Sequence, residues 1–195
     1  YVVAEARMPL YWTTDGTYYQ WSPVPYTLPS GSQITITTHA DFATVDAAGG
    51  TSWRVYIDPV FRLSAYLRSY HVGATSVCLA GHSGGGWTSL IAGALDETID
   101  LVASVHGWCP IGAAGEPHRD YEQTADWPLV DRGMTYEDYS AMVGARRQLI
   151  CTGSDDPVFG ASVLGQSAID AMVASVQARG ANLAQQTFTA LDHHT

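Results

Sequence analysis

Strand-like stretches, several of them apolar, alternate along this chain with segments of helical periodicity. They predict strands at 75–80, 101–105, 148–152 and 184–189. Apolar residues recur at helical spacing over 59–70, from Trp87 to Leu95 and over 163–179. Strands that alternate with helices in this way are typical of a largely parallel sheet covered by helices. We therefore predict an α/β fold, a mostly parallel sheet with helices on both faces.

The segments between these elements differ in composition. Residues 9–32 are rich in Pro, Gly, Thr and Tyr and predict a long loop, whose aromatic side chains could form an apolar wall beside a site. Asp58 and Pro59 fit the cap and first turn of the helix over 59–70. The Pro- and Gly-rich segment 109–144 has one helical candidate, 136–143. Since such excursions between late strands often cover an active site, we predict a cover segment here.

The composition fits a single domain over residues 1–195. The chain is 46% hydrophobic, and a chain of this length buries roughly 70% of its unfolded surface, which is enough for one core. Its 19 acidic residues outnumber nine basic ones, all of them arginine, so the net charge is -10. This balance argues against nucleic acid or an anionic membrane as a partner. It favours a small or neutral ligand.

The same sequence also bears on membrane insertion, localisation, cysteine chemistry and oligomeric state. No apolar run approaches the ~20 residues of a membrane span, and no signal peptide is evident, although the chain opens on Tyr1, so the sequence leaves localisation open. The cysteines, Cys78, Cys109 and Cys151, are odd in number and lack zinc spacing, which favours small buried side chains over a disulfide or a metal site. An early strand at an exposed sheet edge makes a homo-oligomer plausible.

Residues 81–85, Gly-His-Ser-Gly-Gly, match the Gly-x-Ser-x-Gly pattern and follow an apolar run. A strand, a sharp turn and a helix in this order would expose the hydroxyl of Ser83 on a strained backbone, with small neighbours that let strand and helix pass closely. Ser83 is therefore the candidate nucleophile. His82 and Trp87 flank it and are candidates for substrate contact.

A serine hydroxyl is a weak nucleophile at neutral pH, so it needs a histidine to take its proton and a carboxylate to orient that histidine. After the strand at 148–152 comes Gly-Ser-Asp-Asp-Pro-Val, where Asp156 fits better than Asp155. After the last predicted strand come His193 and His194, only one of which can face the serine. The other histidines lie off the expected position; they are His39, His71, His106 and His118.

Residues 81–88, Gly-His-Ser-Gly-Gly-Gly-Trp-Thr, followed by Ala94-Leu95-Asp96 and Ile99, resemble the α/β-hydrolase superfamily. The similarity is to its acetyl-xylan-esterase-like and related esterase-like members, which carry a Ser-Gly-Gly-Gly-Trp elbow. Weaker similarities are Met8-Pro9-Leu10, residues 58–60 and 120–123, and the final His-Thr. The resemblance implies that the catalytic histidine is His194, with His193 as the alternative.

The oxyanion hole and the chain ends depart from the family pattern. The N–H of Gly84, directly after the nucleophile, can serve as one oxyanion donor. The resemblance implies a second donor on a loop upstream of Met8 and a helix after the histidine, and neither is present in this sequence. We therefore expect a hydrolase truncated at its N-terminal strands or unusually reduced, with the second donor unidentified.

Together these residues predict a serine esterase that forms an acyl-enzyme and needs no metal or organic cofactor. Its substrate would be a small-molecule or polymer ester, which the sequence does not specify. Two alternatives stay open. One is a catalytically impaired binding module that keeps the elbow; the other is an amidase, thioesterase or acyltransferase that uses the same triad.

Overall fold

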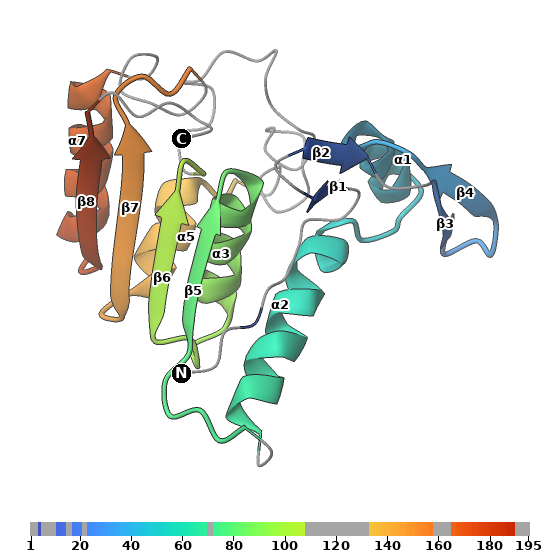
Figure 1. Cartoon of the computed structure of the whole chain (residues 1–195), viewed down its shortest axis with the longest axis horizontal. Helices are drawn as coiled ribbons and strands as arrows, with labels where there is room; N and C mark the ends of the chain where they lie inside the picture. The colour runs from blue at the N-terminus through green and yellow to red at the C-terminus, as the bar shows by residue number, and fades with distance from the viewer. Residues whose placement is uncertain are drawn as a thin grey trace.

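The computed structural model describes residues 4, 11–14, 17–20, 23–69, 72–107, 133–157 and 165–189, with only the backbone of 11–14, 17–20 and 24. Its centre is a parallel sheet of four strands in the order β5–β6–β7–β8 (Figure 1). The strands span Cys78–His82, Leu101–Val105, Arg147–Gly153 and Asn182–Phe188. The four predicted strands are thus confirmed, with shifted ends in all but β6.

Within the described residues, three helices follow these strands in sequence: α3 (Gly84–Leu95), α5 (Tyr136–Val143) and α7 (Gln166–Ala178). They pack side by side, α3 against α5 and α5 against α7. Register partners Val102, Gln148 and Leu183 are buried, each on its own strand. Their common direction places the three helices on one face of the sheet. Helices on the second face stay a prediction.

Helix α2 (Trp53–Arg68) precedes β5 and packs against α3. The predicted start at Pro59 is wrong, because the helix begins six residues earlier and holds Pro59 in its interior. An interior proline costs about 3 kcal/mol. Burial of Tyr56 and Ile57, which stand one turn earlier, offsets part of that cost. The core therefore overrides the local stop signal.

Two antiparallel hairpins occupy the region that the composition had predicted to be a loop. Strand β1 (Tyr11–Thr14) pairs with β2 (Thr17–Gln20), and β3 (Val24–Thr27) pairs with β4 (Gln33–Ile36). A short 3-10 turn, His39–Asp41, and helix α1 (Phe42–Ala47) follow. The loop prediction for 9–32 is wrong at these strands. The predicted aromatic wall concerns side chains outside the described residues.

The core beneath the elbow is aromatic. Trp87 is fully buried, and its Nε1 donates a hydrogen bond to the Tyr136 hydroxyl at 2.9 Å. The ring of Tyr56 meets Trp87 edge-on at a centroid distance of 5.6 Å and Phe42 at 5.4 Å. Edge-to-face pairs of this kind stabilise a core beyond their burial alone. They join α1, α2, α3 and α5 into one unit that holds the start of α3 in place.

The predicted α/β fold is confirmed, as is the helix within 109–144, which packs in the helix layer on α3. Residues 109–132 lie outside the described residues, so the cover segment stays a prediction. In the parts of the chain that the structure describes, none of the helices is long and apolar enough to cross a membrane.

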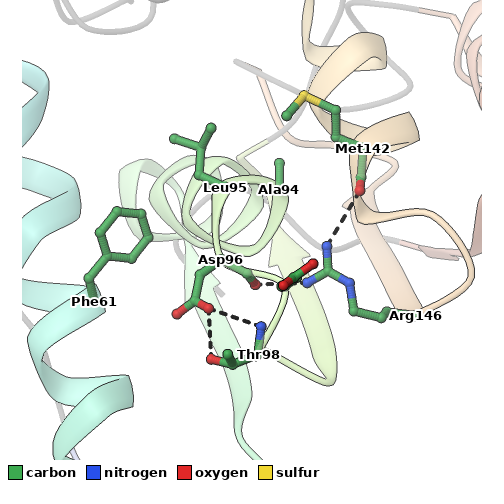
Figure 2. A pocket seen from close by; sticks show the side chains of 8 residues that line it. Phe61, Ala94, Leu95, Asp96, Thr98, Met142 and Arg146 are labelled. Carbon is green, nitrogen blue, oxygen red and sulfur yellow. Dashed lines mark hydrogen bonds between the residues drawn. The ribbon is translucent and has the colours of Figure 1, made fainter.

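Arg146 ties the end of α3 to the end of α5. Its Nη1 donates to the carbonyls of Gly93, Asp96 and Ile99 at 2.8, 2.9 and 2.9 Å. Its Nε donates to the Val143 carbonyl at 3.0 Å. Figure 2 shows the guanidinium between the two helix ends. Because the last carbonyls of a helix lack partners within the helix, this one side chain satisfies acceptors of both.

Removing this guanidinium should destabilise the fold. We expect Arg146→Ala to lower the free energy of unfolding by about 2 to 4 kcal/mol, because several carbonyls lose a charged donor at once. Arg146→Lys should recover only part of the loss, since an ammonium cannot reproduce the planar fork. Urea unfolding followed by circular dichroism measures both. The exposed neighbour Arg147 is the matched control, and an equal effect of Arg147→Ala would contradict this assignment.

Candidate active site

Ser83 lies between the end of β5 and the start of α3 with φ 53° and ψ −124°. A positive φ is rare for a residue with a side chain, and residues held in such strained conformations cluster at functional sites. The turn is fixed by hydrogen bonds, since the Ser83 N–H donates to the Val105 carbonyl at 2.8 Å and the Ser83 carbonyl accepts from the Trp87 N–H at 3.1 Å. Its side chain is half-buried.

Glycines let the chain pass closely around this serine. A Cβ at Gly81 would overlap the Gly85 carbonyl, and one at Gly86 would lie 2.8 Å from the Val105 carbonyl oxygen. At Gly107 a Cβ would lie 2.5 Å from the Trp87 amide nitrogen. These are backbone atoms, which cannot give way as a flexible side chain can. The strand–turn–helix geometry expected from residues 81–85 is therefore present.

Gly84 is the first residue of α3 and is buried. The amide groups of the first helical turn have no carbonyl partner within the helix, and the helix dipole adds partial positive charge there. An anion that formed beside Ser83 would be favoured at this end. The chemistry suits the oxyanion role expected of Gly84, which stays a prediction.

The aspartate pair follows β7 and its two members differ sharply in environment. Asp156 is fully buried, whereas Asp155 is exposed and accepts a hydrogen bond from the Ser154 hydroxyl at 2.9 Å. The Ser154 N–H donates to the Phe188 carbonyl at 2.8 Å, which pins this loop to the end of β8. Both candidate acids, Asp155 and Asp156, therefore lie at the carboxyl edge of the sheet, where Ser83 also lies.

Of the remaining predicted residues, the structure describes His82 and Trp87. His193 and His194 lie outside the described residues. His82 is exposed at the end of β5, beside the nucleophile. Trp87 belongs to the buried core described above, and its contact with substrate stays a prediction.

His106 is a residue that the sequence had placed off the site. It follows the end of β6, and its Nδ1 lies 3.5 Å from Oδ2 of Asp156. Its ring centroid lies 5.3 Å from that of His82. The signal that could have found it is strand order: β6 lies between β5 and β7, so a residue after β6 must fall between the ends that carry Ser83 and Asp156.

Among the described residues, neither the cysteines nor a group of metal ligands provides an alternative catalytic site to Ser83. Burial raises the pKa of the Cys151 thiol, which keeps it protonated and a weak nucleophile. Cys78 is exposed on β5, against its predicted burial, and Cys109 lies outside the described residues; neither Cys78 nor Cys151 forms a disulfide. No cluster of three or more metal-binding side chains occurs where the structure describes the chain.

A separate hollow of about 550 Å³ lies at the opposite end of the helix layer, where α3 ends (Figure 2). Phe61, Leu95 and Met142 contribute apolar side chains to its lining, and Arg146 and Glu97 contribute charged ones. The elbow stands at the start of α3, a whole helix away. This hollow is therefore remote from Ser83 and takes no part in the candidate site.

Comparison with known proteins gives no sequence-level match: no protein-family model matches this chain, and no curated protein sequence matches it. Solved structures do. A promiscuous CE15 esterase from a marine bacterial metagenome is 17% identical, with a TM-score of 0.55 over 75% of this chain and 45% of that one. A puromycin-hydrolyzing peptidase of Mycobacterium tuberculosis is 18% identical, with a TM-score of 0.54 over 71% of this chain and 22% of that one.

The esterase Pf2001 of Pyrococcus furiosus is 11% identical, with a TM-score of 0.52 over 72% of this chain and 54% of that one. The chain thus spans between 22% and 54% of the length of these three structures. At such low identity the likeness concerns the fold. The chain has the α/β-hydrolase fold.

Proposed function

We propose that this chain carries the nucleophile and the acid of a serine hydrolase that cleaves carboxylic esters. The observation that carries the proposal is Ser83 itself, held at φ 53° between a parallel strand and the first turn of a helix. Strain of this kind presents a hydroxyl at the carboxyl edge of the sheet. Several structures of the same fold bear the name esterase, among them the CE15 enzyme and Pf2001, which supports ester substrates.

In the proposed reaction Ser83 attacks the ester carbonyl while a histidine takes its proton and returns it to the leaving alcohol. His194 is the proposed base, with His193 as the alternative. Asp156 is the proposed orienting acid, because burial withdraws it from competing water, whereas Asp155 is exposed. The Gly84 N–H would stabilise the oxyanion, and water would release the acyl group.

A fluorophosphonate probe tests this proposal directly. We expect one covalent adduct per chain, located on Ser83 by peptide mass spectrometry, because only an activated serine attacks the phosphorus centre. Ser83→Ala should abolish labelling. Ser167→Ala, an exposed serine in α7, is the matched control and should label like the wild type. Absence of labelling in folded wild-type protein would overturn the proposal and favour a binding module.

A further inference from the structure

His106 stands at the point where the elbow and the acid loop meet. It follows β6, is 1% exposed and has a φ of 50°. Its backbone N–H donates to the Cys151 carbonyl at 2.9 Å, which fixes it to β7. A left-handed backbone is unfavourable for a residue with a side chain, and Asn and Gly adopt it more readily. The chain therefore maintains a histidine here at an energetic cost.

The imidazole of His106 faces a buried carboxylate. Its Nδ1 lies 3.5 Å from Oδ2 of Asp156, and both side chains are almost completely buried. A buried carboxylate is costly unless donors or an opposite charge lie beside it. The ring of His82, from β5, also lies close to that of His106, at a centroid distance of 5.3 Å. The His106 imidazole thus supplies a polar partner on one side of Asp156.

The same segment is joined to the nucleophile. The Val105 carbonyl accepts the Ser83 N–H at 2.8 Å, and Gly107 fits so closely against Ser83 that a Cβ there would overlap the Ser83 carbonyl. Residues 105–107 therefore touch the elbow with their backbone and Asp156 with a side chain. A substitution at His106 would therefore alter the surroundings of the Asp156 carboxylate.

We propose that His106 is a positioning residue that holds the Asp156 carboxylate in place behind the catalytic histidine. This rests on the proposed function, because Asp156 must be the acid of the triad for the contact to affect catalysis. His106 touches neither the substrate nor the reacting atoms in this scheme. It acts through Asp156, whose Oδ2 lies 3.5 Å from its Nδ1.

Two substitutions separate this role from mere packing. His106→Asn keeps a side-chain donor near the Nδ1 position and accepts the left-handed backbone; His106→Gly removes the donor while relieving the backbone. We expect His106→Gly to lower kcat for p-nitrophenyl acetate by between about tenfold and a hundredfold, because a small displacement of catalytic groups has effects of this size. KM should change little, and His106→Asn should restore most of kcat. Equal kcat values for His106→Gly and wild type would overturn the proposal, as would a failure of Asn to rescue.

A measurement that needs no catalysis tests the contact itself. The chain has seven histidines, and the imidazole resonance missing from His106→Asn identifies His106 in the NMR spectrum. Asp156→Asn should displace this resonance, because a neutral amide replaces the carboxylate that lies 3.5 Å from Nδ1. Asp155→Asn is the matched control and should leave it unchanged. If hydrolysis fails but the shift appears, the contact is supported while the proposed function falls; if the shift is absent, the inference falls whatever the activity.

Discussion

Ser83→Ala is expected to lower kcat/KM for p-nitrophenyl acetate by about 10⁴-fold or more. The side chain of Ser83 supplies the nucleophile, and removal of a triad member leaves only the catalysis that the oxyanion donors and binding provide. The loss should appear in kcat, because the hydroxyl forms its bond to carbon in the transition state. Initial rates over a range of ester concentrations measure both kcat and kcat/KM.

The control for this experiment is stability. Removing one hydroxyl from a half-buried side chain should leave the urea midpoint nearly unchanged. The backbone strain at position 83 is the same for alanine as for serine. Ser167→Ala should match wild type in both rate and midpoint. Wild-type hydrolysis no faster than that of Ser83→Ala would contradict an esterase. A parallel series of ester, thioester and anilide substrates with one leaving group would then separate the acyl chemistries from one another.

Much of the sheet could be predicted because most of its strands contain a short apolar run. Strand β6 is apolar except for Ser104, and the middle of β7 is apolar from Leu149 to Cys151, so their positions are visible without knowledge of their partners. Helix α2 was harder. Its start depends on Tyr56 and Ile57 packing beneath the elbow, a tertiary contact that outweighs the local signal at Pro59.

The hairpins between residues 11 and 36 could not be predicted for a related reason. Exposed antiparallel strands take Thr, Gln and Pro, residues that composition assigns equally well to loops; Pro25 and Thr27, for example, are exposed on β3. Pairing between strands decides the outcome. That information lies in the register of two segments and not in either one alone.

The candidate site divides in the same way. Ser83 and Asp156 could be found because each follows a recognisable strand and carries a local motif. His106 has no motif, and its importance depends on β6 lying between β5 and β7. A list of spacings along the chain holds no such neighbour relation. His106 could therefore be assigned to the site only once the order of strands in the sheet was known.

Gly81→Ala and Gly85→Ala should have opposite outcomes, although both replace a glycine of the Gly-x-Ser-x-Gly pattern. A Cβ at Gly81 would overlap the backbone of Gly85 and approach Oγ of Ser89 to 2.7 Å, whereas a Cβ at Gly85 would meet nothing within 4 Å. We expect Gly81→Ala to lower the free energy of unfolding by about 3 kcal/mol. Gly85→Ala should be neutral or stabilising by up to about 1 kcal/mol, since alanine is the better helix former.

The same pair tests whether the elbow geometry, and not only its stability, serves the reaction. Gly81→Ala must displace the first turn of α3, because the atoms it meets there include backbone that cannot rotate away. Such a shift moves Ser83 and the Gly84 N–H together, so hydrolysis should fall by about a hundredfold even at a temperature where the variant stays folded. Gly85→Ala leaves both in place and should retain wild-type rates. Urea unfolding and ester hydrolysis on the same samples measure the two effects, and equal behaviour of the two variants would show that close packing at Gly81 does not set the position of the nucleophile.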